Sequence, residues 1–326
     1  MLKKWKILLY LLSAFALLCL STVFSYYLCN ENVHFERFCN KLFIREISAD
    51  TLSLHYILSH PEVYGIDHAA STLPFYEAES SAKSCAQIED YLHTLSKIQP
   101  SKLTPDNQYT YELLVTYLES LLRLKQYPFF DEPFSPVNGV HSQFPILLSE
   151  YTFRTEKDIQ DYLQILAAGK SYFDSLLCYQ KEKTKAGLGT DDLSLSKSAT
   201  QCLSMLTKDE LENNSHFLQS SFYEKANALY KQGIINATQF ETYLLENNAL
   251  LLEVLYPTYQ SLSQELINLQ TENESEPQGL AHYPKGKEYY RYLVQFETGS
   301  IRSIFLVLHS AASPCIFVNA KMLIVK

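Results

Sequence analysis

The segment Thr155–Gly187, TEKDIQDYLQILAAGKSYFDSLLCYQKEKTKAG, carries the signals that decide the fold class. Thr155 followed by Asp158 is typical of a capping box at a helix start, with Asp in place of the usual Glu. Apolar residues then recur at helical spacing, and Gly169 and Gly187 are placed to end two successive helices. We therefore expect two amphipathic helices, one on each side of Gly169. The apolar face of the first comprises Ile159, Tyr162, Leu163, Ile165 and Leu166.

The same pattern extends over most of the chain on both sides of this segment. Thr104 and Pro105 are typical of a helix start, and Gly233 is placed to separate two helices. Only 9 glycines in 326 residues, with little alternation of apolar and polar residues, argue against a β-sheet. We predict an all-α, multi-helix domain over residues 31–302. The expected helices cover 34–59, 84–98, 105–124, 155–169, 171–186, 194–206, 209–232, 238–256, 257–269 and 287–296.

The amino terminus combines a basic start with a long apolar run. Three lysines lie within the first six residues, and Ile7–Asn30 has no charged residue. About 20 apolar residues suffice to cross a bilayer, and basic residues before such a run keep the N-terminus in the cytoplasm. Residues 1–30 are therefore expected to form a hydrophobic signal or anchor helix, with residues 7–28 in the membrane and the rest of the chain outside the cytoplasm.

Three fates of this leader remain open. It could stay in the membrane as a signal anchor, or it could be cleaved after Ser25, where the small residues suit a signal peptidase. Lipidation at Cys29 is the third alternative, and the bulky Leu28 before it disfavours that reaction. The protein is thus expected to be membrane-anchored or secreted.

Composition excludes some classes of partner and site. The chain is 47% hydrophobic and 19% charged, and its net charge of −9 disfavours binding to nucleic acid. Seven cysteines include no CxxC pair, and an odd number argues against a complete disulfide framework. Cys178 and Cys202 could meet if their helices are neighbours, although buried free thiols are the favoured interpretation.

The sequence lacks the motifs that carry catalysis. A gluzincin-type zinc site needs two histidines one helical turn apart with a glutamate between them, and none of the nine histidines forms such a pair. The nearest approaches are His34 with Glu36 and His55 with His60, whose spacings do not place both groups on one helix face. A nucleophile elbow and glycine-rich phosphate loops are also absent from the sequence. We therefore assign no catalytic or metal-binding residue and no cofactor, and the substrate-binding residues stay unassigned.

A few residues carry weaker functional alternatives. His141, in a Gly-Val-His-Ser-Gln segment expected to be a loop, could touch a ligand, although a hydrogen-bonded structural role is favoured. Tyr289, Tyr290 and Tyr292 could line a peptide cleft, although tyrosines at helical spacing are more often core residues. The adjacent carboxylates, Asp191 and Asp192, are expected to be solvated surface groups.

Near the carboxyl end, Gly279–Ser303 contains a Tyr-Pro pair, then x-Gly-x-x-Tyr-Tyr, and a Thr-Gly stop. This order resembles the centre of the bacterial family called domain of unknown function 885, or DUF885. Three earlier segments resemble the family in the same order: His141–Leu166, Tyr172–Leu188 and Val254–Leu266. The resemblance implies a zinc-peptidase-like protein whose metal motif lies further downstream, so zinc is implied only for the full-length family. No metal residue carries over to this chain.

The tail, residues 303–326, changes character and contains no acidic residue. A reading-frame slip near 301–304 would explain this change and a missing second half. The alternative is a genuine apolar helix and strand that pack on the domain. We expect a truncated, non-catalytic DUF885-like chain that could contact a peptide substrate. The other hypothesis is a membrane-anchored, extracellular helical module that binds a protein partner.

Overall fold

The computed structural model describes residues 12, 15–18, 30–74, 78–270 and 279–299. These residues are mostly helical and form no β-strand, although one isolated bridge joins Asp50 and Ser71. The predicted all-α class is confirmed. Nearly all of the predicted membrane segment, 7–28, and the whole tail, 303–326, lie outside the described residues. Within the described part of the chain, no helix has both the length and the apolar composition needed to cross a membrane.

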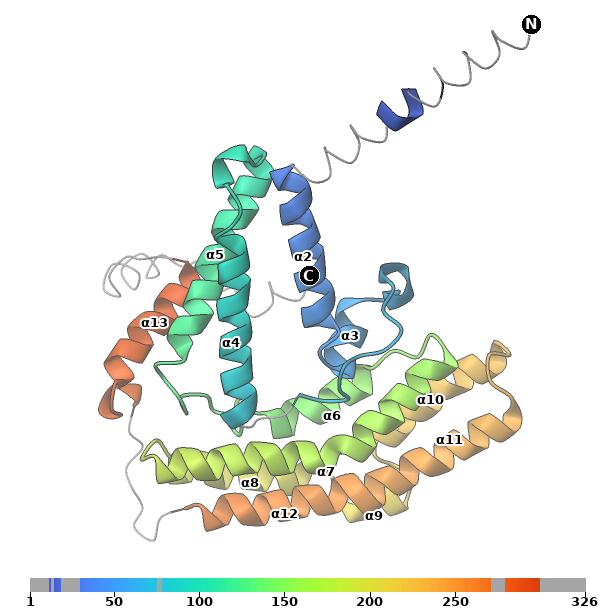
Figure 1. The fold of residues 1–326 in the computed structure, drawn as a ribbon. Coiled ribbons are helices and arrows are strands. Elements are labelled where there is room, and N and C mark those ends of the chain that lie inside the picture. Colours follow the sequence, from blue (N-terminus) through green and yellow to red (C-terminus); the bar gives the residue numbers. More distant parts are fainter. Residues whose placement is uncertain (1–11, 13–14, 19–29, 75–77, 271–278, 300–326) are drawn as a thin grey trace, which may run out of the picture. The chain divides into compact units, whose positions relative to one another are not determined.

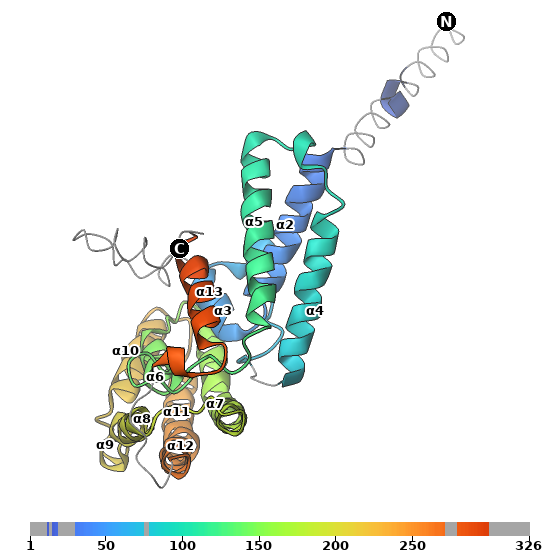
Figure 2. The same ribbon diagram turned by 90° about the vertical axis from the view of Figure 1, so that its left-hand side faces the viewer.

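The chain divides into two compact units, residues 1–46 with 83–125 and residues 47–82 with 126–326. The first unit is built from three helices that Figure 2 shows side by side: α2 (Glu31–Ile47), α4 (Ala78–Leu95) and α5 (Pro105–Leu124). A short 3₁₀ turn, η2 (Pro100–Lys102), connects the last two. The buried apolar side chains between these helices are Phe35, Tyr91, Leu95, Ile98, Leu103 and Leu118.

Helix α5 starts as the sequence predicts, with Thr104 as its N-cap and Pro105 in the first turn. The Thr104 hydroxyl accepts a hydrogen bond from the Asn107 amide N–H at 3.4 Å. Asn32 on α2 adds a long-range support, because its Oδ1 accepts from the Thr104 N–H at 2.8 Å and from Asn107 Nδ2 at 2.9 Å. One side-chain amide therefore joins the start of α5 to α2.

The second unit is a larger helical layer in which α7 lies beside a continuous helical run formed by α11, η3 and α12 (Figure 1). Its core includes Tyr162, Phe173, Phe222 and Tyr259, and the Tyr259 hydroxyl donates to the His141 carbonyl at 2.7 Å. Its elements are α3 (Thr51–Ile57), η1 (Pro61–Tyr64), α6 (Val140–Glu150), α7 (Glu156–Lys185), α8 (Asp192–Met205), α9 (Lys208–Glu212), α10 (Phe217–Lys231), α11 (Ala237–Leu250), the π-helical η3 (Leu251–Leu255), α12 (Tyr256–Asn268), η4 (Leu280–His282) and α13 (Gly286–Thr298).

Helix α7 is one helix of 30 residues, so the predicted stop at Gly169 is wrong. A Cβ atom at Gly169 would lie 3.2 Å from Leu255 Cδ1, which shows that this glycine lets η3 approach α7 closely. A mid-helix glycine costs about 1 kcal/mol relative to alanine, and the packing against η3 offsets that cost. The capping box of Thr155 and Asp158 is confirmed, with both of its reciprocal hydrogen bonds present.

Two predicted helices are each broken in two by a local cap. The helix expected over 34–59 stops at Ile47, because the Asp50 carboxylate accepts from the Ser53 N–H at 2.8 Å and starts α3 instead. The helix expected over 209–232 is interrupted between α9 and α10, where Asn214 adopts a φ of +54° and His216 caps α10. Both breaks follow the rule that Asp, Asn and His side chains compete for backbone donors.

Two further expectations differ from the structure in the opposite direction, because helix forms where a break was expected. His141 lies in the first turn of α6 and not in a loop. Pro257 does not start a new helix, since the run continues from α11 into α12 through η3. Proline has no N–H to give to the preceding turn, and the wider π turn just before it accommodates that missing hydrogen bond.

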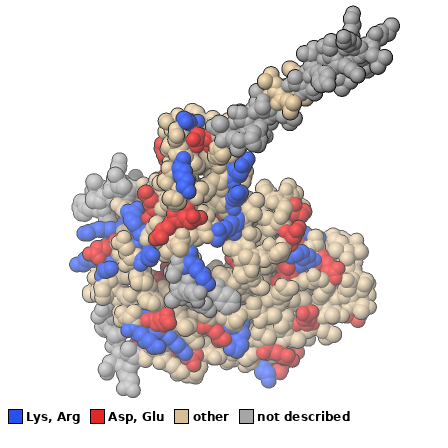
Figure 3. Space-filling view, viewed as in Figure 1, with Lys and Arg blue, Asp and Glu red and all other residues tan. Residues whose placement is uncertain are grey.

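Basic and acidic side chains are intermixed on the face shown in Figure 3, which has no broad patch of one sign. Ion pairs one helical turn apart also join basic and acidic side chains, as in Lys157–Asp161 and Lys170–Asp174 on α7. Such a surface is typical of a solvated helical domain. The absence of a nucleic-acid partner stays a prediction from net charge.

Candidate functional site

A groove of about 660 Å³ lies in the second unit, between the chain around α3 and η1 and the amino-terminal part of α7. Backbone hydrogen bonds hold the first of these sides together, since Ala70 N–H donates to the Ser48 carbonyl at 2.7 Å and Thr51 N–H donates to the Ser71 carbonyl at 2.9 Å. These bonds fold the segment after η1 back against the start of α3. The lining residues with polar groups include His55, Tyr151, Arg154, Asp158 and Asp161.

His55, on α3, is buried within the wall of this groove with 7% of its surface exposed. Its Nε2 accepts a hydrogen bond from the Thr152 backbone N–H at 3.2 Å. Its Nδ1 lies 3.4 Å from Asp158 Oδ1. Because a backbone N–H can only donate, Nε2 is the acceptor and Nδ1 carries the proton in the neutral ring. Both nitrogens are engaged, so His55 has no free lone pair to act as a general base.

Asp158 connects the helix cap to the groove. Its Oδ2 accepts from the backbone N–H groups of Arg154 and Thr155 at 2.9 and 2.8 Å and from the Thr155 hydroxyl at 3.1 Å. Burial raises the pKa of this carboxyl, and the hydrogen bonds from His55, Arg154 and Thr155 outweigh burial, so that its pKa is lowered overall. Asp158 is therefore a fixed carboxylate that orients the His55 ring.

Tyr151 stacks on His55, with ring centroids 3.5 Å apart and an interplanar angle of 12°. Its side chain is fully buried, and its hydroxyl has no hydrogen-bond partner among the described residues. Burial raises the pKa of Tyr151, as do the nearby charges of Asp161 and Asp158, whereas Arg154 lowers it. Tyr151 lines the groove together with Arg154, Asp158 and Asp161, so its neutral phenol ring forms part of the groove wall.

Arg154 supplies a second hydrogen-bond donor at the same place. Its guanidinium forms no ion pair with any residue in the described part of the chain, although Asp158 and Asp161 both line the groove. Asp161 is instead paired with Lys157. Two side chains of the groove lining therefore carry donors without acceptors among the described residues: the partly exposed Arg154 guanidinium and the Tyr151 hydroxyl, which is buried in the wall. Such donors suit a ligand with carbonyl or carboxylate oxygens.

A comparison with protein-family models assigns the chain to a family. The model of the bacterial family described as protein of unknown function DUF885 matches residues 62–305. The chain belongs to the DUF885 family. The match begins within η1 at the groove and extends past the end of α13, so it includes the start of α7 and both donor residues. A search of curated proteins found no match to this DUF885 chain.

A solved structure shares the fold of this DUF885 chain. It is a crystal structure of a protein from Colwellia psychrerythraea that is described as a candidate lipoprotein. The two are 17% identical with a TM-score of 0.67, and the match covers 84% of this chain and 46% of that protein. At this identity the likeness shows the fold alone. The DUF885 chain described here spans about half the length of its structural neighbour.

His141 is fully buried in α6, and its Nε2 donates to Gln201 Oε1 at 2.9 Å. Burial lowers its pKa, which favours the neutral ring. Gly139 allows this arrangement, because a Cβ there would lie 2.7 Å from the His141 ring. The structure therefore places His141 where the structural interpretation expects it.

The tyrosines of α13 divide between core and surface. Tyr289 and Tyr292 are buried and pack against the ring of Tyr127, whereas 40% of Tyr290 is exposed. Burial and the nearby Asp131 raise the pKa of Tyr289 to about 12, so it remains a neutral core residue. The predicted helix end at Gly299 is confirmed by its φ of +63°.

The remaining candidate residues are spread over several elements. Asp191 is the N-cap of α8 and accepts from the Ser194 N–H at 2.9 Å, so it is not merely a solvated surface group. Cys178 is exposed and Cys202 is buried, and both are free. His34 and Glu36 lie on α2 in the first unit, and His55 and His60 line the groove.

Sequence patterns do not single out most of the groove residues. Asp158 stands out only as part of a capping box, and His55 only through its spacing from His60. The contact of Asp158 with His55 joins residues 103 positions apart. Sequence spacing alone does not reveal such a contact, since it depends on how α3 packs against α7.

Proposed function

We propose that this DUF885 chain is a non-catalytic peptide-binding domain. The observation that carries the proposal is the Arg154 guanidinium in the groove, which has no ion pair among the described residues and lies in the same lining as the buried, likewise unpartnered Tyr151 hydroxyl. A peptide offers backbone carbonyls and a terminal carboxylate, which are the acceptors that these groups need. A groove of about 660 Å³ falls within the usual range of 300–1,000 Å³ for ligand sites.

The zinc chemistry implied by the family resemblance does not fit the residues of this chain. The sequence has no histidine pair with gluzincin spacing. Within the described ranges, no cluster of three or more His, Cys, Asp or Glu side chains is arranged to hold a metal ion. Both nitrogens of His55 are already engaged within the protein. The proposal therefore includes peptide binding and omits hydrolysis.

We place the binding domain outside the cytoplasm, either anchored or secreted. The uncharged run of Ile7–Asn30 behind three lysines supports this location. The description of the Colwellia psychrerythraea protein as a candidate lipoprotein is compatible with it. Fractionation of cells into cytoplasm, membrane and medium tests the location, and recovery of the chain in the cytoplasm alone would contradict it.

The function is tested with the full chain and a library of short peptides, each with a free or an amidated carboxyl terminus. We expect binding without cleavage, and weaker binding when Arg154→Gln removes the guanidinium charge. Lys170→Gln is the matched control, because Lys170 is exposed on α7 and pairs with Asp174 outside the groove. Cleavage of the library with one bound zinc per chain would overturn the proposal, as would equal binding by both variants.

A further inference from the structure

A second pocket, of about 510 Å³, lies between α10 and α11, and it shares no lining residue with the groove at α3 and α7. Side-chain amides and a tyrosine dominate its lining. The lining includes Asn214, Gln219, Ser220, Tyr223, Glu224 and Asn248.

The amides of this pocket form a connected hydrogen-bond network. Gln219 Nε2 lies 3.0 Å from the Leu211 carbonyl and 3.2 Å from both Asn214 Oδ1 and Asn248 Oδ1. An amide nitrogen carries two hydrogens and can serve two of these three acceptors, and other donors also reach them: Asn247 Nδ2 lies 3.3 Å from Asn248 Oδ1, and the Asn214 N–H lies 3.3 Å from the Leu211 carbonyl. Asn248 Nδ2 also donates to Asn214 Oδ1, at 2.9 Å.

Two buried amide oxygens at this network lack a donor among the described residues. Gln219 is 6% exposed, and its Oε1 has no hydrogen-bond partner among the described residues. Asn247, beside Asn248, is 1% exposed, and its Oδ1 also has no hydrogen-bond partner among the described residues. Buried acceptors without donors are costly, and natural proteins retain few of them. Both oxygens are buried, so the amides open to a ligand are those of Asn214, which is exposed, and Asn248, which is half-buried.

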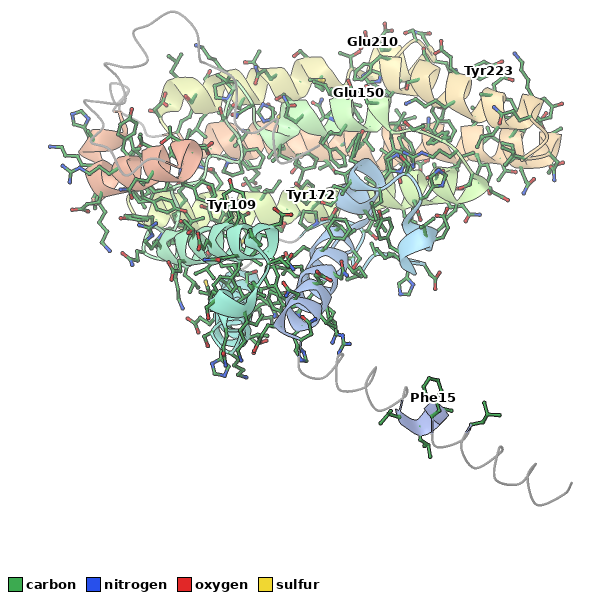
Figure 4. The ribbon with its side chains drawn as sticks, turned by 90° about the horizontal axis from the view of Figure 1, so that it is seen from above. Phe15, Tyr109, Glu150, Tyr172, Glu210 and Tyr223 are labelled. Atoms are coloured by element: carbon green, nitrogen blue, oxygen red, sulfur yellow. The ribbon has the colours of Figure 1, made fainter. Side chains whose placement is uncertain are left out.

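Exposed aromatic rings lie next to the amides. Tyr223 is 50% exposed and Tyr230 is 41% exposed, and the ring of Phe240 lies between them at centroid distances of 5.7 and 5.4 Å. Figure 4 shows Tyr223 on α10 at the outer edge of the helical layer. An accessible ring beside hydrogen-bonding groups suits a ligand that has one apolar face and polar edges.

The charge of the pocket lining further restricts the class of ligand that fits. Glu224 is the charged residue of the pocket lining, which includes no lysine or arginine. Phosphate esters and peptides with a free carboxylate would find no cation here. A neutral sugar needs none, since its hydroxyls pair with amides and carboxylates while the C–H face of its ring stacks on an aromatic side chain.

From these contacts we infer that the α10–α11 pocket binds a neutral oligosaccharide. One sugar ring stacks on Tyr223, and its hydroxyls hydrogen-bond with Asn214, Asn248 and Glu224. The site is separate from the peptide groove and goes beyond the proposed function, so either can fail without the other.

The test is saturation-transfer NMR and calorimetry on the full chain with three probes: maltotriose, cellotriose and the trimer of N-acetylglucosamine. We expect at least one probe to bind, and Tyr223→Ala to abolish its saturation transfer. Tyr109→Ala is the matched control, since Tyr109 is a 65% exposed tyrosine on α5. Figure 4 marks both tyrosines.

A second variant guards against an effect of Tyr223→Ala on folding. Asn214→Gly removes an amide and retains the positive φ of this position, which glycine adopts readily. We expect it to weaken binding by about two- to tenfold, as the loss of one hydrogen bond would. The inference is overturned if no trisaccharide binds at millimolar concentration, if both pocket variants bind like wild type, or if triglycine binds this pocket and the sugars do not.

Discussion

The contact between His55 and Asp158 yields a quantitative prediction about the stability of the second unit. Asp158→Ala removes the acceptor of three capping hydrogen bonds at the start of α7 and the partner of His55 Nδ1. Loss of a helix cap costs about 1 kcal/mol. A buried N–H left without an acceptor costs about 1–3 kcal/mol more. We expect Asp158→Ala to lower the free energy of unfolding by about 2–4 kcal/mol.

His55→Ala also lowers the free energy of unfolding, and part of its effect is shared with that of Asp158→Ala because both remove the same contact. It removes the ring stacked on Tyr151 and leaves the Thr152 N–H without its acceptor. In the double variant no His55 N–H remains to be stranded by the loss of Asp158. The double variant should therefore be less destabilised than the sum of the single variants, by about 1–2 kcal/mol, within the usual range for residues in contact.

The assay is urea unfolding of the full chain, followed by far-ultraviolet circular dichroism, for the wild type, both single variants and the double variant. Asp174→Ala serves as the control, because Asp174 is 58% exposed and makes an ion pair with Lys170 one turn away on the same helix. Exposed pairs of this kind contribute about 0–1 kcal/mol. Strict additivity of the two substitutions, or an effect of Asp158→Ala no larger than that of Asp174→Ala, would refute the reasoning.

Three further predictions concern acid stability, helix packing and thiol reactivity. The folded-state pKa of Asp158 is lowered, so the stability that its carboxylate contributes is present above the unfolded pKa of about 4 and is lost as pH falls through the folded value. Acid titration should therefore destabilise the wild type more steeply than Asp158→Asn. Parallel curves of unfolding free energy against pH would contradict this. Gly169→Val should cost about 1–3 kcal/mol in urea unfolding because its side chain overpacks against η3, whereas Ala167→Val, at an exposed position of α7, should cost less than about 1 kcal/mol. Iodoacetamide should alkylate the exposed Cys178 in the native protein and spare Cys202, because burial raises the pKa of the Cys202 thiol to about 12. Equal labelling of the two cysteines in mass spectrometry would contradict the burial of Cys202 in α8.

The fold class and several helix ends could be predicted from local signals. Thr104 with Pro105 and Thr155 with Asp158 identify helix starts, and each cap is present where the spacing places it. Gly233 adopts a left-handed φ of +73° just after α10. These features are readable because a cap is formed by residues within about four positions of one another.

Two of the errors in the predicted helices, at Gly169 and at His141, arise where a distant contact outweighs a local preference. Gly169 is a helix breaker by propensity, yet α7 continues through it because the absent side chain makes room for Leu255. His141 follows a glycine and a loop-like segment, but burial in α6 and a hydrogen bond to Gln201 keep it in a helix. Neither partner can be identified from sequence spacing.

The amino-acid sequence by itself determined that this chain is helical, where most of its helices begin, and that its histidines lack the spacing of a zinc peptidase motif. Those properties depend on neighbouring residues and on counts. The tertiary structure alone decided that His55 meets Asp158 and that Tyr151 lies in the groove wall, where its hydroxyl has no partner among the described residues. Such contacts join α3 to residues about a hundred positions later, and only the packing of buried side chains selects them from the many pairings that local preference allows.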